Sequence, residues 1–247
     1  MTSNVLIAPL VALMRSVLNR DGFVVVDRLE SQDMAVSVLG AFGVMLPQYD
    51  GSTTHEVTYR QGNEGLLYSQ SSNAIGPHTE APGWQPTPAY VALYCHRQAR
   101  CGGGHTDLLD VRALLAALDE PELDLLAKAE VTFPWPMNPN GKGGTRSAML
   151  YSEPDGRLSL RFSYNVLTTN LYAPPVDAVV DGDHLPLGEP GRALAQRVST
   201  LFSEQRTSIL VPEGSLLVWD NRRMLHGRSQ YRDRDRHLTR FFVAPGS

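Results

Sequence analysis

The chain has 247 residues, of which 42% are hydrophobic and 19% are charged. This composition excludes a disordered or fibrous protein, and the length fits one domain spanning residues 1–247. The 22 basic and 26 acidic residues give a formal net charge of -4. This charge argues against binding to nucleic acid, and no apolar stretch is long enough to cross a bilayer, so we expect neither partner.

The first part of the chain predicts two helices on either side of a buried strand. The apolar run Val5 to Met14 predicts a core-facing helix, because no basic segment or cleavage site marks it as a signal peptide. The β-branched run Phe23-Val24-Val25-Val26 predicts a strand. Ser31 is a suitable N-cap for a second helix that runs to about Leu46. Residues 48–76, rich in Gly, Ser, Thr and Asn, predict a long loop with short strands that closes over a site.

The rest of the chain predicts short strands separated by turns, with helices in the insertions. Helices are expected from Asp110 to about Leu118, from Pro121 to about Ala129 and from Gly191 to about Glu204. The Gly- and Pro-rich segment from Pro134 to Arg146 predicts a mobile loop. The predicted strands are Ala89–Cys95, a strand that ends near Leu108, Leu158–Tyr164, Ser208–Val211, Ser215–Trp219 and Leu238–Val243. This order predicts a mainly β protein with flanking helices around a double-stranded jelly-roll core.

Cysteine content bears on the cellular compartment. Cys95 and Cys101 are the two cysteines of the chain, too few for a disulfide scaffold in a protein of this length. We therefore expect a cytoplasmic location. The sequence gives no indication of the oligomeric state.

The most informative motif is His78-Thr79-Glu80, followed far along the chain by His226. Residues two apart on a strand point to the same face, so His78 and Glu80 can both reach one metal ion. His226 follows the apolar run Leu216-Leu217-Val218-Trp219 and can supply a third ligand from another strand. Two imidazoles and one carboxylate hold Fe(II) on one face and leave the opposite face open. The sequence therefore predicts a non-haem iron site.

Arginines are concentrated near the C-terminal end. Interleaved aspartates make Arg232 and Arg234 candidates for solvated loop residues. A guanidinium also matches the plane of a carboxylate with two parallel hydrogen bonds, so we expect one or two of these arginines to bind a carboxylate. The group comprises Arg222, Arg223, Arg228, Arg232, Arg234, Arg236 and Arg240.

Four motifs together carry a resemblance to a known family. They are Pro77-His78-Thr79-Glu80, Gly103-Gly104-His105-Thr106, Trp219-Asp220-Asn221 before His226-Gly227, and Asp235-Arg236-His237-Leu238-Thr239-Arg240. With them the chain resembles the Fe(II)- and 2-oxoglutarate-dependent dioxygenases of the taurine dioxygenase superfamily. The His-Thr-Glu form is similar to the clavaminate synthase-like branch, in which Glu replaces the usual Asp. The resemblance runs from Gly22-Phe23-Val24 to Arg240 and implies the jelly-roll core of that branch.

The resemblance implies roles for the matching residues. Arg236 would pair with the distal carboxylate of 2-oxoglutarate, and Thr106 would hydrogen-bond the same group. Arg240 would lie near the other end of the cosubstrate or near the acid group of the substrate. Arg234 and Arg240 remain alternatives to Arg236 as the carboxylate partner. The implied iron ligands are His78, Glu80 and His226.

The resemblance also implies a reaction that uses Fe(II), O2 and 2-oxoglutarate. The enzyme would hydroxylate, desaturate or cyclise at an unactivated C–H bond, while 2-oxoglutarate is decarboxylated to succinate and CO2. Glu80 favours these outcomes over halogenation, because halogenating relatives have a small residue at that position. The many arginines and the lack of a long apolar groove favour a small polar metabolite, such as an amino acid or a carboxylate. A role in natural-product biosynthesis is implied by the resemblance alone.

Several side chains near the motifs are predicted to bind the substrate. Trp84 follows the ligand pair in an expected lid, and Arg161 and Asn165 lie on or beside an alternating strand. The predicted substrate-binding residues are Trp84, Arg146, Arg161, Tyr164 and Asn165.

Three other interpretations compete with an oxygenase. The same barrel could use its metal only as a Lewis acid, in a hydrolase or isomerase, which would leave Arg236 and Thr106 without a cosubstrate to hold. The protein could be a non-catalytic binding module, against which the intact ligand triad argues. A zinc cluster could form elsewhere, although the spacing lacks two well-separated pairs; its ligands would be Cys95, His96, Cys101 and His105.

Overall fold

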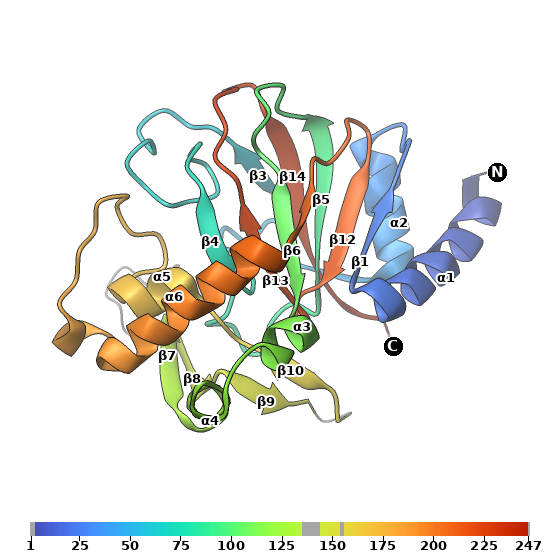
Figure 1. Cartoon of the computed structure of the whole chain (residues 1–247). Helices are drawn as coiled ribbons and strands as arrows, with labels where there is room; N and C mark the ends of the chain where they lie inside the picture. The colour runs from blue at the N-terminus through green and yellow to red at the C-terminus, as the bar shows by residue number, and fades with distance from the viewer. Residues whose placement is uncertain (1–2, 135–143, 154–155, 247) are drawn as a thin grey trace.

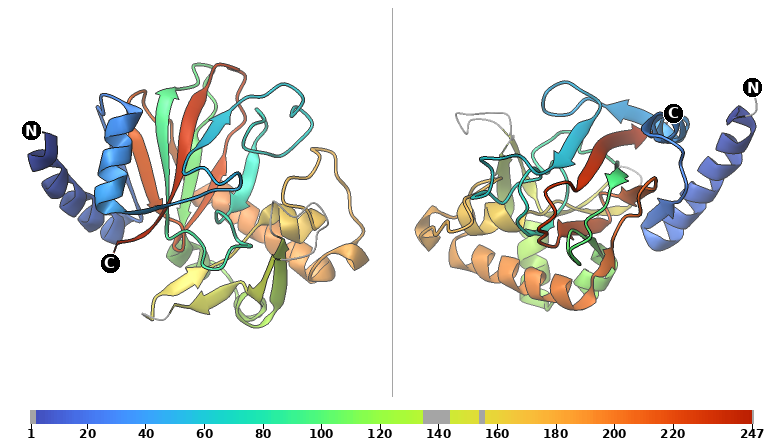
Figure 2. Two further views of the ribbon diagram at one scale, coloured as in Figure 1. Left: turned by 180° about the vertical axis from the view of Figure 1, so that it is seen from behind. Right: turned by 90° about the horizontal axis from the view of Figure 1, so that it is seen from above.

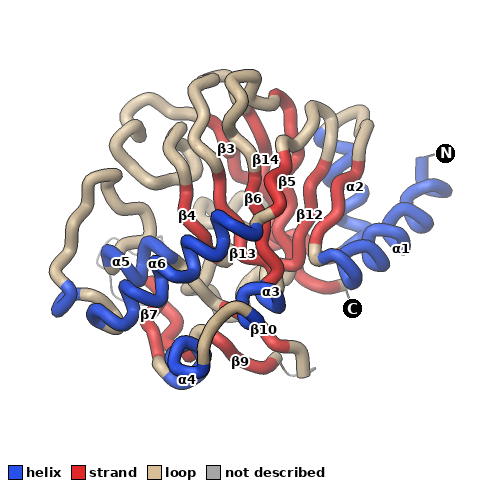
Figure 3. The backbone as a smooth tube through the Cα atoms, in the orientation of Figure 1, coloured by secondary structure: helices blue, strands red, loops and turns tan. Residues whose placement is uncertain are grey.

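The structure is a computed structural model that describes residues 3–134, 144–153 and 156–246. It is mainly β, with helices at its edges (Figure 1, Figure 3). The strands are β1 (Phe23–Val26), β2 (Gly43–Leu46), β3 (His55–Thr58), β4 (Ile75–His78), β5 (Tyr90–Arg97), β6 (Thr106–Asp110), β7 (Glu130–Pro134), β8 (Gly144–Ala148), β9 (Leu150–Ser152), β10 (Leu158–Leu160), β11 (Thr207–Ile209), β12 (Leu216–Asp220), β13 (Met224–Arg228) and β14 (His237–Pro245).

Helices occur at the start of the chain and in the insertions between strands. Among the described residues, no helix is both long enough and apolar enough to cross a membrane. The helices are α1 (Ser3–Asp21), α2 (Gln32–Phe42), α3 (Val111–Ala116), α4 (Glu120–Lys128), α5 (Tyr164–Thr169) and α6 (Gly188–Gln205), with a short 3-10 turn at Gly182–His184.

The larger sheet has six strands and is buried on both faces. Its order is β1-β12-β5-β14-β2, and β3 also pairs with β14. In β12, Leu216 and Val218 pack against α1 and α2, whereas Leu217 and Trp219 belong to the cluster on the opposite face. Because successive side chains of a strand point to opposite faces, this two-sided burial explains the unbroken apolar run of β12. Figure 2 shows α2 lying across the outer face of this sheet.

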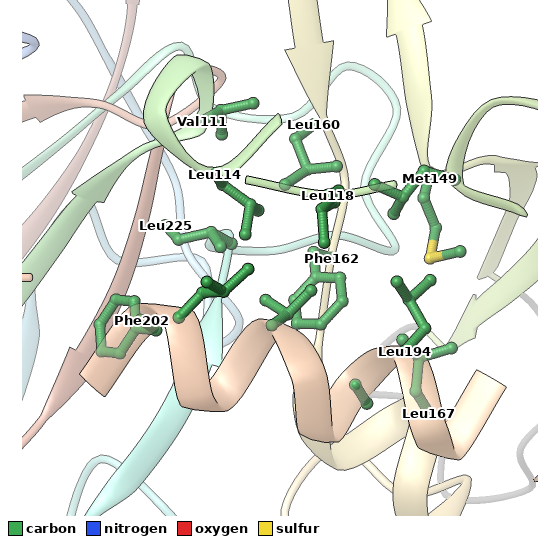
Figure 4. Close-up of a cluster of buried hydrophobic side chains, with 14 of the residues drawn as sticks. Val111, Leu114, Leu118, Met149, Leu160, Phe162, Leu167, Leu194, Phe202 and Leu225 are labelled. Atoms are coloured by element: carbon green, nitrogen blue, oxygen red, sulfur yellow. The ribbon is translucent and has the colours of Figure 1, made fainter. Parts of the chain in front are cut away.

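The smaller sheet has the order β11-β6-β13-β4, and α6 covers its outer face (Figure 1). Leu225 of β13 packs in the same cluster as Phe202 of α6 (Figure 4). A Cβ added to Gly227 would lie 3.2 Å from the Phe202 ring, so this position also faces the helix. Alternation along β13 therefore turns His226 and Arg228 to the inner face, toward the larger sheet.

Two predicted elements end earlier than the sequence pattern indicated. The second helix stops at Phe42, and Gly43–Leu46 forms β2, which pairs with the end of β14. A Cβ at Gly43 would lie 2.2 Å from the carbonyl oxygen of Ala244, so only glycine permits this close pairing. The helix ends before Gly43 because that residue pairs with β14. The predicted strand Leu158–Tyr164 is also shorter, because Ser163 caps α5 after β10 ends at Leu160.

Two other segments also differ from expectation. The first helix continues well past Met14, to Asp21. The predicted loop from Pro134 to Arg146 is partly a hairpin, since β7 and β8 pair at its ends, with buried Val131 and Phe133 holding β7 in the core. Residues 135–143, the middle of that predicted loop, lie outside the described residues.

Arg223 fastens α1 to the smaller sheet, and its replacement by Met should destabilise the protein. Its guanidinium donates to Asp110 Oδ2 at 2.6 and 2.9 Å and to the carbonyls of Asn19 and Arg20 at 2.9 Å each. Those carbonyls lie in the last turn of α1, where the helix supplies no donors. We expect R223M to lower the free energy of unfolding by about 2 kcal/mol in urea titrations. As a control, R112M removes an exposed arginine from the same Asp110 and should cost less than about 0.5 kcal/mol; equal losses would contradict this role.

Candidate metal centre

Strand pairing brings two histidines together. β4 and β13 are antiparallel, and His78 and His226 are partners in their register. The centroids of the two imidazole rings lie 4.0 Å apart. The pairing of the two strands therefore places the two imidazoles side by side.

Glu80 lies beyond the end of β4, and Asn221 holds its backbone. The main-chain N–H of Glu80 donates to Asn221 Oδ1 at 2.7 Å. Asn221 Nδ2 donates to the carbonyls of Glu80 and Pro88, both at 3.0 Å. Asn221 belongs to the turn between β12 and β13, the strand that carries His226. That turn thus fixes Glu80 relative to His226.

These contacts gather the three residues that the sequence singled out. The potential ligand atoms of His78, Glu80 and His226 all lie within 4.8 Å of one another, and His226 Nε2 is 3.5 Å from Glu80 Oε2. Across the described part of the chain, no other set of three His, Cys, Asp or Glu side chains comes as close. The alternative zinc cluster is therefore not formed there; its members were Cys95, His96, Cys101 and His105.

Protonation states in the cluster suit metal binding. His78 Nδ1 lies 2.9 Å from the carbonyl oxygen of Gly76, a contact in which Nδ1–H donates and Nε2 is left as the free lone pair. Burial and the neighbouring His226 lower the pKa of His78 to about 3. Burial alone would raise the pKa of Glu80, but Arg240 and the two histidines hold it well below its usual value. The site therefore combines a neutral imidazole with an ionised carboxylate.

Three further side chains hold the Glu80 carboxylate. Tyr49 and Tyr172 donate to its Oε1 at 3.0 and 3.2 Å, and Arg240 Nη1 lies 3.0 Å from its Oε2. Burial and the Glu80 charge raise the pKa of both phenols, so both remain hydrogen-bond donors. Sequence motifs do not reveal the two tyrosines; the one signal was that Tyr49 belongs to the loop expected to close over a site.

Arg236 and Thr106 lie in the same pocket as the cluster. Arg236 is 2% exposed, and its Nε donates to the carbonyl of Gly104 at 3.2 Å. Its Nη1 is buried with no hydrogen-bond partner among the described residues. Arg234, the alternative, is exposed and lies over the ring of Tyr59. A buried guanidinium with unused donors is suited to bind an anion.

A single pocket contains all these groups. It encloses about 830 Å³ of space, including the solvent at its open mouth. Apolar side chains from the cluster between the two sheets form part of its wall, including Val57, Leu93 and Trp219. Its polar lining includes Tyr49, Tyr68, Thr106, Tyr164, Asn165, Tyr172, Arg228, Arg236 and Arg240.

Some of the residues predicted to bind substrate line the pocket, and others lie outside it. Asn165 lines the pocket, as does Tyr164. Trp84 is outside the lining, because it packs edge-on against Tyr49 and Phe242 with centroid distances of 5.5 Å.

The two predicted arginines also lie outside the pocket lining. Arg146 is exposed on β8, where its Nε is 2.9 Å from Glu130 Oε2. Arg161 is buried over the ring of Tyr151, and its Nε and Nη1 have no partner in the part of the chain that the structure describes.

Comparisons with known proteins agree with this geometry. The sequence profile of the family "Taurine catabolism dioxygenase TauD, TfdA family" matches residues 2–242, whereas a comparison with curated protein sequences gave no match. An asparagine oxygenase in complex with Fe(II), 3-hydroxyasparagine and succinate is similar in structure, with a TM-score of 0.74 and 22% identity over 96% of this chain and 79% of that one.

Two further solved structures share the fold. The oxygenase OrfP in complex with Fe and alpha-ketoglutaric acid has a TM-score of 0.68 and 16% identity, over 96% of this chain and 80% of that one. PvcB from Pseudomonas aeruginosa has a TM-score of 0.67 and 16% identity, over 94% of this chain and 79% of that one. At these identities the likeness establishes a common fold.

Proposed function

Since the chain belongs to the taurine catabolism dioxygenase TauD, TfdA family, we propose that it is an Fe(II)- and 2-oxoglutarate-dependent oxygenase. It hydroxylates, desaturates or cyclises at an unactivated C–H bond of a small polar metabolite. The observation that carries this proposal is the convergence of His78, Glu80 and His226 within 4.8 Å, in a pocket that Arg236 also lines. A facial iron ligand set beside a buried guanidinium whose Nη1 has no partner among the described residues meets the needs of a metal and a dicarboxylate.

Fe(II) fits the three side chains in residue type and in protonation. His78 offers Nε2 because its Nδ1 is occupied by the Gly76 carbonyl, and Glu80 is ionised. Tyr49 and Tyr172 fix the orientation of that carboxylate. Partners of this kind hold a ligand in place before the metal arrives.

A buried arginine of the pocket is suited to bind the cosubstrate. We assign the distal carboxylate of 2-oxoglutarate to Arg236 and Thr106, which are 2% and 4% exposed. The apolar side chains of Leu93 and Trp219 line the same pocket, and a wall that excludes water would strengthen a charge-assisted hydrogen bond. Arg240 pairs with Glu80 through Nη1, and its Nη2 has no hydrogen-bond partner within the described parts of the chain. It could therefore contact the other end of the cosubstrate or an acid group of the substrate.

The metal with its cosubstrates and the protein side chains have different roles in the proposed reaction. Iron with 2-oxoglutarate and O2 supplies the oxidising power, and the cosubstrate leaves as succinate and CO2. The protein holds Glu80 ionised through Arg240 and keeps His78 neutral through burial. No side chain of the pocket is required as a nucleophile.

The pocket lining favours a neutral or anionic substrate. Among its described residues, Glu80 is the one carboxylate, whereas Arg228, Arg236 and Arg240 all contribute positive charge. The asparagine oxygenase complex contains 3-hydroxyasparagine, which supports an amino acid or a small carboxylate as the class of substrate. We place substrate recognition on Asn165 with its neighbour Tyr164, rather than on Trp84, Arg146 or Arg161, which do not reach the lining.

Other properties belong to the same proposal. The two facing sheets are taken as a double-stranded β-helix of the clavaminate synthase-like type, supported by the likeness to asparagine oxygenase. Residues 1–247 are taken as one domain, because the family profile covers residues 2–242 without interruption. We also propose a cytoplasmic location and a role in natural-product biosynthesis. The proposed partners are small molecules, with neither nucleic acid nor a membrane among them.

One assay tests the proposed function. Anaerobic protein given Fe(II) and 2-oxoglutarate should develop a weak visible charge-transfer band, and on exposure to air it should release succinate. A hydrolase or isomerase that uses its metal as a Lewis acid would show neither signal, nor would a binding module. Absence of both the band and succinate would therefore overturn the proposal, and screening amino acids for faster succinate release would identify the substrate.

Gly104→Ala should weaken 2-oxoglutarate binding. The added Cβ would lie 2.9 Å from Arg236 Nε and 3.0 Å from Arg236 Cδ, so the guanidinium must move. We expect the dissociation constant, measured from the charge-transfer band, to rise by about tenfold or more, the effect of losing about 1.4 kcal/mol. Gly102→Ala is a matched control, because Gly102 has nearly the same φ, +81° against +78°, but open space around its Cβ. A similar rise in the dissociation constant for both variants would show that backbone strain causes the effect, and would contradict the proposed contact with Arg236.

A further inference from the structure

Two loops that line the pocket are joined to each other. One loop runs over residues 59–74, between β3 and β4, and the other over residues 170–176, after α5 (Figure 1). The N–H of Leu67 donates to the carbonyl of Pro174 at 2.9 Å, and the N–H of Val176 donates to the carbonyl of Gly65 at 2.8 Å. The pair forms a single covering layer, called here the double loop.

Arg228 fastens this double loop to β13. It lies two residues after His226 on the inner face of the strand and is 6% exposed. Its Nη1 donates to the carbonyl of Ser69 at 2.8 Å, and its Nη2 lies 2.6 to 3.2 Å from three more carbonyls of the same loop. Those three carbonyls belong to Tyr68, Ser71 and Asn73.

Tyr231 connects Arg228 to the proposed cosubstrate site. The guanidinium carbon of Arg228 is 5.1 Å from the centroid of the Tyr231 ring, and that of Arg236 is 5.0 Å from the same centroid. The Tyr231 hydroxyl donates to the carbonyl of Ser71 at 3.1 Å, and its N–H donates to the carbonyl of Ser72 at 3.0 Å. One buried ring thus contacts both cations and the loop.

Two buried guanidiniums around one ring repel each other. No carboxylate among the described residues pairs with either of them: carbonyls hold Arg228, and Arg236 keeps an unused donor. An anion bound to Arg236 would offset the repulsion and leave Arg228 more firmly held by its four carbonyls.

We propose that Arg228 is a positioning residue that couples occupancy of the Arg236 carboxylate site to ordering of the double loop. The proposal rests on the proposed function, because it takes 2-oxoglutarate as the anion. Cosubstrate binding then organises Tyr68 and Tyr172, which line the pocket, before the substrate arrives. Such coupling needs a difference in free energy between the loop with and without the anion, which exchange of backbone amides can detect.

Hydrogen–deuterium exchange of the full chain tests this coupling. Peptides covering residues 59–74 and 170–176 are followed in anaerobic protein with Fe(II), with and without saturating 2-oxoglutarate. We expect the cosubstrate to slow exchange in both loops by about fivefold or more, a change of roughly 1 kcal/mol in opening. The charge-transfer band reports cosubstrate binding separately.

Three variants separate coupling from a merely structural role. R228M should exchange rapidly in both loops with or without 2-oxoglutarate, while still forming the band. R236Q removes the repelling charge without adding an anion, so its loops should exchange slowly even before 2-oxoglutarate is added. R222M is the matched control, because Arg222 is a partly buried arginine that pairs with Asp220 instead of the loops, and its response should equal that of the unaltered protein.

The outcomes distinguish a failure of the proposed function from a failure of the coupling alone. A missing band in the unaltered protein overturns the proposed function and this inference with it. A normal band without slower loop exchange, or a full 2-oxoglutarate response in R228M, overturns the inference alone. Rapid exchange in R236Q would also contradict it. If R228M fails to fold, the comparison of R236Q with the unaltered protein decides the matter.

Discussion

Glu80→Ala should reduce succinate formation by more than about 100-fold. Replacing a residue that only holds a metal ligand in place lowers activity or metal affinity by roughly 10- to 100-fold, and loss of the ligand itself should cost more. Glu80 is the anionic member of the ligand set, and without it only His78 and His226 remain for the metal. The variant should also lose the charge-transfer band at Fe(II) concentrations that saturate the unaltered protein. Turnover and metal binding should therefore fall together.

The same substitution carries a stability cost that the sequence alone did not indicate. Arg240 pairs with Glu80 at 3.0 Å and is buried, so the variant leaves an uncompensated buried charge, which costs about 3–5 kcal/mol. Glu80→Gln keeps the shape and the acceptor for Tyr49 and Tyr172, and it should fold better while still losing activity. Glu56→Ala, which removes a carboxylate that pairs with His237 outside the pocket, is the control. Turnover near normal in a folded Glu80 variant would contradict the assignment of the ligand.

Arg236→Gln should raise the 2-oxoglutarate requirement by about 30- to 1000-fold, the loss of charge-assisted hydrogen bonds worth about 2–4 kcal/mol. The guanidinium is buried, and its Nη1 has no partner among the residues that the structure describes, whereas glutamine is neutral and has a single amide donor group. The rate at saturating cosubstrate should change far less than the concentration needed to reach it. Succinate release measured against 2-oxoglutarate concentration gives both quantities.

Arg234→Gln is the matched control for this prediction. Arg234 is exposed, two residues away along the chain, and its replacement should leave the 2-oxoglutarate requirement within about twofold, as for most surface substitutions. If the phenotype followed Arg234 or Arg240 instead, the carboxylate partner would have to be reassigned.

The ligand triad was predictable from the sequence, although the predicted position of Glu80 on the strand was wrong. The motif predicted that His78 and Glu80 share the face of one strand, but β4 ends at His78. Glu80 reaches the cluster because Asn221 holds its backbone, a contact between residues 141 positions apart. The motif located the right residues, whereas the long-range contact that places one of them has no local pattern.

The groups that surround the triad were harder to foresee for the same reason. Tyr49 and Tyr172 meet at Glu80 from two loops far apart in the sequence, and neither belongs to a motif. Arg228 was one arginine among seven in the C-terminal cluster. Its role emerges from four loop carbonyls far earlier in the chain. Loop-to-loop contacts depend on the completed fold and leave little trace in periodicity.

Secondary structure was most predictable where one physical rule dominated. The β-branched run Phe23–Val26 formed β1, and Ser31 caps α2 as expected. The end of α2 was misplaced because Gly43 pairs closely with β14, a tertiary contact that overrides helix propensity. The same limit applies to Arg146, which was expected in a loop and lies on a strand.

A crystal structure of the protein loaded anaerobically with Fe(II) and 2-oxoglutarate, with iron located by its anomalous scattering, would test the iron site and the cosubstrate site together. We expect one iron peak bonded to His78, Glu80 and His226, with 2-oxoglutarate chelating it and its distal carboxylate on Arg236. An iron peak elsewhere, a missing bond to any of the three side chains, or a cosubstrate carboxylate away from Arg236 would contradict it.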